Sequence, residues 1–242
     1  MFRTLRLARA CAAISLLATV GCAVNPGRGD GPAPDAVPPR CPFDPAVTMV
    51  VGDSVATEWF KYVTWPQGIT VFSTSYGGSG YTMTDLSVNI GQRVQRQVDA
   101  CGADLGNVIL SAGIADLAAG QPVEPLIAAV RTLSENLRIQ GIPVTWLTIT
   151  PFSDYNRPGG DDRDTRRLAF NAWLTTPGSV TGEVIDCSST LADPVRPTFL
   201  DARFYQWVGI LQADNFHLSD DGYQAYAACI STALAAPAPL PD

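Results

Sequence analysis

Three polar side chains in this 242-residue chain have the types and spacing of an acyl-transfer site. Ser54 ends the stretch Val51-Gly52-Asp53-Ser54, and His217, the one histidine of the chain, follows Asp214 by three residues. A serine hydroxyl becomes a nucleophile when a histidine accepts its proton and a carboxylate orients that histidine. We therefore expect Ser54 as nucleophile, His217 as general base and Asp214 as its partner. The alternatives are that Ser54 only caps a helix and that His217 is structural.

Glycines and carboxylates follow other apolar runs in the same way. Gly80 ends the glycine-rich stretch 76–80, and Gly113 and Asp116 follow the run at 108–110. A glycine lets the backbone approach a reacting carbonyl, so Gly80 could offer an N–H donor to an oxyanion. An ordinary loop and a helix cap at Asp116 are the alternatives. Since ligands bind at the carboxyl ends of strands in open parallel sheets, we expect Asp53, Gly113 and Asp116 to bind substrate.

The apolar pattern predicts the elements that must position these residues. Continuous apolar runs predict buried strands, and apolar residues repeating every three to four positions predict helices between them. Strand–helix alternation implies an α/β fold, a three-layer sandwich with a central parallel sheet of about five strands flanked by helices. The expected strands are 47–51, 69–72, 108–110, 144–149 and 184–185, and the expected helices include 90–98, 126–137, 165–174 and 220–234.

In their order along the chain, these segments resemble the blocks of the SGNH, or GDSL-like, hydrolase family over about residues 46–232. Gly52-Asp53-Ser54 matches the first block, Gly80 the second, 113–116 the third and 214–217 the last. The resemblance implies a flavodoxin-like fold and a serine ester hydrolase that uses no metal or organic cofactor. It also implies that the backbone N–H groups of Ser54 and Gly80 hold the oxyanion.

One position departs from the family pattern. The third block of the family reads G-x-N-D, and its asparagine donates to the oxyanion, whereas this chain has Ala115 there. Loss of one such donor typically lowers the rate by roughly 100- to 1,000-fold. Ala115 therefore favours an alternative, a non-catalytic glycan- or lipid-binding protein on the same fold. The intact set of Ser54, Asp214 and His217 argues against it.

The expected reaction is hydrolysis or transfer of an acyl group through an acyl-serine intermediate. Water as acceptor makes an esterase and a sugar hydroxyl makes an O-acyltransferase, and the sequence does not choose between them. We expect the substrate to be an acylated glycan or lipid of the cell envelope. A lysophospholipase or thioesterase would share the mechanism. The formal net charge of −7 argues against nucleic acid as a partner, because phosphates require a basic surface. We expect a monomer.

The N-terminal residues have the pattern of an export signal. Arg3, Arg6 and Arg9 precede a short apolar run at 10–20, too short for a membrane span. The run ends in Thr19-Val20-Gly21-Cys22, which resembles a lipobox, where the signal is cut before a lipidated cysteine. We therefore expect a signal peptide at 1–21, and a lipid anchor at Cys22 that holds the protein to the outer face of the cell membrane. A plain signal peptide and a secreted protein are the alternative.

The remaining composition defines the domain and its cross-links. We expect residues 22–40 to contain the lipobox cysteine and a Pro/Gly-rich spacer, 41–235 to form the hydrolase-like domain, and 236–242 to form a disordered tail. Four cysteines then remain in an exported chain, an even number without a CxxC pair, which favours two disulfides over zinc. Of the three pairings we favour Cys41–Cys101 and Cys187–Cys229, from their expected places at the strand ends.

Overall fold

Five strands form a parallel sheet in the computed structural model of this chain, which describes residues 47–66, 70–73, 82–84, 90–101, 105–154, 162–208 and 213–236. They lie in the order β2-β1-β3-β4-β5, and every neighbouring pair is parallel. This confirms the predicted α/β fold class and the five strands. The strands are β1 (Val47–Gly52), β2 (Thr70–Ser73), β3 (Leu105–Ser111), β4 (Val144–Leu147) and β5 (Glu183–Ile185).

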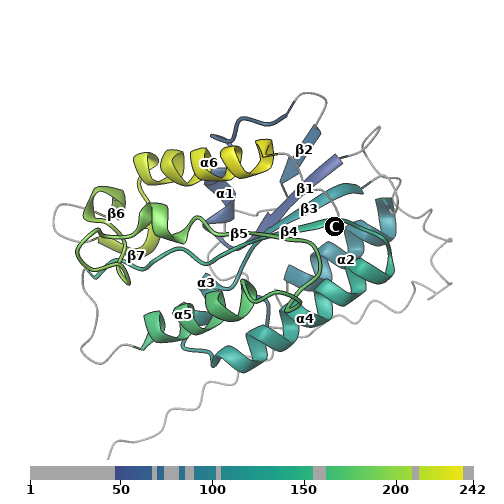
Figure 1. Ribbon diagram of the computed structural model, residues 1–242, viewed down its shortest axis with the longest axis horizontal. Helices are drawn as coiled ribbons and strands as arrows, with labels where there is room; N and C mark the ends of the chain where they lie inside the picture. The colour runs from purple at the N-terminus through teal and green to yellow at the C-terminus, as the bar shows by residue number, and fades with distance from the viewer. Residues whose placement is uncertain are drawn as a thin grey trace, which may run out of the picture. The chain divides into compact units, whose positions relative to one another are not determined.

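Helices cover both faces of the sheet. Figure 1 shows α1 and α6 on one face and α2, α4 and α5 on the other. The four predicted helical patterns all form helices, with ends within a few residues of those expected. The helices are α1 (Ala56–Trp59), α2 (Ile90–Cys101), α3 (Ile114–Ala118), α4 (Val123–Ile139), α5 (Arg163–Leu174) and α6 (Asp220–Ala235).

The core explains why these patterns form these elements. All six residues of β1 are buried, as a central strand covered on both faces requires. On α2 the buried side chains recur at four-residue spacing, at Ile90, Val94 and Val98, so this helix presents a single apolar stripe to the sheet. The sheet and helices therefore form a rigid frame, and its strand ends can position a site.

One element was not predicted. A short two-stranded antiparallel sheet, β6 (Tyr205–Trp207) and β7 (Ala213–Leu218), precedes α6 and is separate from the main sheet. The single-turn helix η3 (Ala202–Phe204) leads into it. The sequence predicted only a turn here, because β6 is three residues long and β7 does not alternate apolar and polar residues. Asp214 and His217 therefore lie on a strand of this β6–β7 hairpin.

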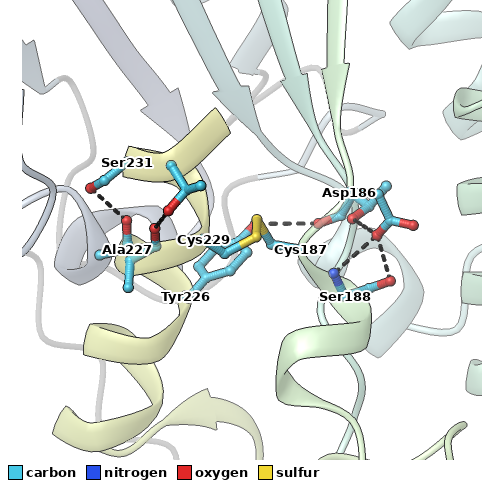
Figure 2. The surroundings of a disulfide bond; sticks show 10 residues. Asp186, Cys187, Ser188, Tyr226, Ala227, Cys229 and Ser231 are labelled. Carbon is cyan, nitrogen blue, oxygen red and sulfur yellow. Dashed lines mark hydrogen bonds between the residues drawn. A yellow bond between two sulfur atoms is a disulfide. The ribbon is translucent and has the colours of Figure 1, made fainter. Parts of the chain in front are cut away.

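A disulfide joins Cys187 to Cys229, as predicted. It links the chain just after β5, at the start of the short helix η2 (Ser188–Leu191), to α6 (Figure 2). Cys101 is also disulfide-bonded. Its predicted partner, Cys41, lies outside the described residues, so the second pairing stays a prediction.

The other predictions for the chain ends also fall outside the described residues. They are the signal peptide at 1–21, the anchor at Cys22, the spacer to residue 40 and most of the tail at 236–242. All described residues belong to one compact unit. None of the helices in the described ranges is both long enough and apolar enough to cross a membrane.

Candidate active site

The site lies where the strand order of the sheet reverses. β1 is bordered by β2 on one side and β3 on the other, and the chain leaves β1 and β3 toward opposite faces. Such a switch point opens a crevice at the carboxyl ends of the strands. Ser54 follows β1 there, and Ile114, the first residue of α3, follows β3.

Gly52 allows the chain to turn sharply after β1. A Cβ at Gly52 would stand 2.0 Å from the carbonyl oxygen of Ser111, so no side chain fits at this close approach between β1 and β3. The next residue, Asp53, donates its backbone N–H to the same oxygen at 3.2 Å. This contact fixes the turn, and Ser54 is left partly exposed beyond it.

The structure brings Ser54, His217 and Asp214 together. His217 Nε2 lies 2.7 Å from Ser54 Oγ, and His217 Nδ1 lies 2.9 Å from Asp214 Oδ2. With the proton on Nδ1, the imidazole donates to Asp214 and presents the Nε2 lone pair to the serine hydroxyl. This is the arrangement in which a histidine can remove a serine proton. About a fifth of each of the Asp214 and His217 side chains is exposed.

The carboxylate of Asp214 is held ionised by hydrogen bonds. Its Oδ1 accepts the backbone N–H groups of Phe216 at 2.9 Å and His217 at 2.8 Å. Burial acts to raise the pKa of Asp214, but the hydrogen bonds from the His217 side chain and from these two N–H groups outweigh it and lower the pKa to about 2. The charge is thus available at neutral pH to stabilise an imidazolium.

Asp53 lies behind the serine and joins the segments after β1 and β3. Its Oδ1 accepts the N–H of Val55 at 3.2 Å, and its Oδ2 accepts the N–H of Ile114 at 3.1 Å. Burial raises the pKa of Asp53 to about 7, although these N–H groups and that of Ala115 favour the ionised form. Asp53 is only 2% exposed.

Asp116 holds the segment that follows the glycine-rich stretch. Its Oδ2 accepts the N–H of Met83 at 2.9 Å, and its Oδ1 accepts the N–H of Thr84 at 3.1 Å and the Thr84 hydroxyl at 2.5 Å. Asp116 is fully buried. The expectation that Asp53 and Asp116 contact substrate stays a prediction. Both carboxylates are occupied by protein donors behind the site and position the backbone.

Gly113 is required for the conformation of the backbone. Its φ of +115° is in the region that favours glycine, and a Cβ there would stand 2.9 Å from Ile149 Cδ1. Gly113 thus allows the backbone to turn into α3, and its expected contact with substrate stays a prediction. Ala115 is the next residue but one, and it is partly exposed while Ile114 and Asp116 on either side are buried. The position of the absent asparagine is thus open to solvent.

The predicted oxyanion donor Gly80 lies outside the described residues, so its role stays a prediction. Among the described residues that follow it in the sequence, Met83 and Thr84 are anchored by Asp116. Within the described ranges, no group of three or more His, Cys, Asp or Glu side chains is placed to hold a metal ion. Ser153 contacts the β6–β7 hairpin, donating to the backbone carbonyl oxygens of Asp214 and Asn215. No feature of the sequence predicted this contact.

Comparison with known proteins agrees with this geometry. A sequence model of the GDSL-like lipase/acylhydrolase family matches residues 50–225. No curated protein matches the sequence.

Solved structures share the fold at low sequence identity. A GDSL-like lipase from Bacteroides thetaiotaomicron is 16% identical, with a TM-score of 0.59 over 78% of this chain and 87% of that one. An acetyl xylan esterase is 18% identical, with a TM-score of 0.55 over 78% and 99%. The OSK domain of Drosophila Oskar is 16% identical, with a TM-score of 0.59 over 77% and 88%. At these identities the likeness establishes the fold alone.

Proposed function

Since the chain belongs to the GDSL-like lipase/acylhydrolase family, we propose that it is a serine esterase that cleaves or transfers acyl groups through Ser54. The observation that carries this proposal is the continuous hydrogen-bonded path from Ser54 Oγ through the His217 ring to Asp214 Oδ2. A helix cap or a structural histidine would not require a partly exposed serine hydroxyl 2.7 Å from the Nε2 atom.

The mechanism follows from the roles of these atoms. His217 Nε2 takes the proton of Ser54 as the hydroxyl oxygen attacks the ester carbonyl carbon. The resulting imidazolium is stabilised by the Asp214 carboxylate, and it returns the proton to the departing alcohol. Water or a sugar hydroxyl then attacks the acyl-serine, again with His217 as base, and releases the acyl group. Backbone N–H groups of Ser54 and Gly80 are the donors proposed for the oxyanion.

We further propose that the substrate is an ester on a glycan or lipid of the cell envelope. The export pattern at 1–21 and the lipobox-like Cys22 support this location, and an acetyl xylan esterase among the structural relatives supports a carbohydrate ester. The Cys22→Ala variant tests the anchor. It should leave the membrane fraction or fail to be processed, and an unchanged membrane fraction would exclude Cys22 as the anchor.

The activity itself is tested with a fluorophosphonate probe, which bonds covalently to an activated serine. The wild-type protein should be labelled, and Ser54→Ala should not. Ser189→Ala is a matched control, because Ser189 is an exposed serine in η2 and should have no effect. Retention of labelling and of ester turnover in Ser54→Ala would refute the assignment of Ser54.

Ala115 favours a second candidate, a glycan- or lipid-binding protein that has lost efficient catalysis. With no side-chain donor at this position, the oxyanion has one hydrogen bond fewer than the family pattern provides. The same experiment separates the two candidates. Failure of wild-type protein to react with the probe or to turn over activated esters, while it binds acylated glycan or lipid, would favour the binding protein.

A further inference from the structure

Residues 152–154, which we call the strap, lie between the end of β4 and the β6–β7 hairpin. Phe152 is fully buried and forms a parallel bridge with Phe199. The backbone N–H of Leu200 donates to the carbonyl oxygen of Phe152 at 2.7 Å. The strap is therefore fixed to the body of the domain on one side.

On its other side the strap holds the strand that carries Asp214 and His217. Ser153, which is fully buried, donates its backbone N–H to the carbonyl oxygen of Asn215 at 2.8 Å. Its hydroxyl donates to the carbonyl oxygen of Asp214 at 3.2 Å. Both accepting carbonyls lie within three residues of the imidazole that faces Ser54.

The last residue of the strap holds the other strand of the hairpin. The hydroxyl of Tyr205, on β6, donates to Asp154 Oδ1, and the backbone N–H of Asp154 donates to the same hydroxyl oxygen at 3.3 Å. Tyr205 is paired across the hairpin with Leu218, the residue after His217. Tyr205 is 5% exposed and the Asp154 side chain is 30% exposed, so this contact is partly shielded from water.

Arg196, which lies outside the strap, stabilises the negative charge of Asp154. Its guanidinium forms ion pairs with Asp154 Oδ2 and with Asp193. Burial opposes ionisation, but the hydrogen bonds from Tyr205 and Arg196 lower the pKa of Asp154 below its ordinary value. Burial and the adjacent Asp154 raise the pKa of Tyr205 to about 12. The contact is therefore a neutral phenol donating to a carboxylate throughout the physiological range.

We propose that Ser153 and Asp154 are positioning residues that set the place of His217 relative to Ser54. The proposal rests on the proposed esterase function. Its physical basis is that an isolated two-stranded hairpin is marginally stable in water, and this hairpin is not part of the five-stranded sheet. The bonds to the strap supply the lateral support that the sheet does not. A base misplaced by about 1 Å can lower a rate by about 100-fold.

The experiment combines histidine NMR with kinetics. His217 is the only histidine, so protein labelled with 15N-histidine and freed of any affinity tag gives the ring signals of this residue alone. Asp154→Asn removes the charge of the acceptor, Tyr205→Phe removes the hydroxyl that donates to it, and Ser153→Ala removes the hydroxyl bond to Asp214. Glu135→Gln is the matched control, because Glu135 is also paired with an arginine but lies exposed on α4.

We expect Asp154→Asn and Tyr205→Phe each to lower kcat for an activated ester by about tenfold with little change in KM, as the loss of one charge-assisted hydrogen bond implies. The double variant should fall little below Tyr205→Phe, since without the hydroxyl no hydrogen bond remains for the charge at residue 154 to strengthen. The Nδ1 proton signal of His217, which reports its bond to Asp214, should broaden or shift in these variants and stay unchanged in Glu135→Gln.

The proposal is overturned if Tyr205→Phe, which keeps the aromatic ring and should fold, matches the control in both kcat and the His217 signal. A loss of thermal stability with unchanged kcat and His217 signal would also overturn it, because the strap would then be merely structural. The NMR readout does not require turnover. If the wild-type protein were inactive, the esterase proposal would fail while the coupling of strap and imidazole would still be measured.

Discussion

Asp53 gives the fold an unusual pH dependence that can be measured. Its carboxyl is buried behind Ser54, and burial raises its pKa from the ordinary 3.8 to about 7. Between these two pH values the folded protein holds a proton on Asp53 that the unfolded chain has released. Stability must therefore fall as the pH rises from about 4 to about 7, since the state that binds more protons is favoured at low pH.

The size of this effect follows from the shift. A difference of about 3 units, from 3.8 to about 7, corresponds to roughly 4 kcal/mol at about 1.4 kcal/mol per unit. This loss of stability is absent below about pH 4, grows as the pH rises through the interval and is complete above about pH 7. It is a large fraction of the 5–15 kcal/mol that stabilises a typical domain.

The assay is urea unfolding followed by tryptophan fluorescence at pH values from 4.5 to 8.5, for the wild type and for Asp53→Asn. The asparagine does not titrate, and every other ionisable group is common to both proteins. The difference between the two free energies of unfolding should change by a few kcal/mol between pH 4.5 and 7.5, in favour of the variant as the pH rises. A difference independent of pH would refute the reasoning, because it would mean that the N–H groups of Val55 and Ile114 keep Asp53 ionised throughout.

Three further outcomes are expected. Ala115→Asn should raise kcat for p-nitrophenyl acetate, by up to about 100-fold if the amide reaches the oxyanion. Ser54→Ala serves as the blank in this assay. An unchanged rate would show that another group already supplies the donor. Asp214→Ala should lower kcat by about 10⁴-fold. It should also lower the free energy of unfolding at neutral pH by about 2 kcal/mol, and this deficit should vanish as the pH falls from 4 to 2, where the wild-type carboxylate takes up its proton; a deficit independent of pH would contradict the assigned cause. Replacing Cys187 and Cys229 with serine should lower the free energy of unfolding by about 4 kcal/mol, measured in urea, because the bond closes a loop with a sequence separation of 42, and an unchanged midpoint would contradict this.

The places of the main-sheet strands could be predicted because their signal is local, although β4 ends at Leu147, two residues before the predicted end, and β3 begins at Leu105, three residues before the predicted start. The run at 47–51 is apolar throughout, and the structure continues it to Gly52, where the turn toward Ser54 begins. The same holds for α4, whose apolar spacing is regular over several turns. Periodicity reports burial directly, so a strongly buried strand or helix is visible in the sequence.

The β6–β7 hairpin could not be predicted because its stability comes from contacts distant in sequence. Tyr205 is held by Asp154, 51 residues earlier, and Asp214 is held through its backbone by Ser153, 61 residues earlier. Neither strand has a run long enough to indicate β structure by itself. The i to i+3 spacing of Asp214 and His217 did indicate their contact, since the N–H groups of residues 216 and 217 fold back onto the carboxylate in a local turn.

The roles of Asp53 and Asp116 could not be read from their positions, because a carboxylate at a strand end can face either the crevice or the protein. In the structure both side chains face the protein. Like Asp214, each accepts backbone N–H groups and so fixes one segment of the site. Asp53 ties the turn after β1 to α3, Asp116 ties α3 to the segment at Met83, and Asp214 ties the turn that places the imidazole. Each of the three side chains accepts at both oxygens, whereas asparagine would set an N–H donor against a backbone N–H. The three aspartates thus assemble the site by joining loop and helix-start segments that lie beyond the ends of the strands.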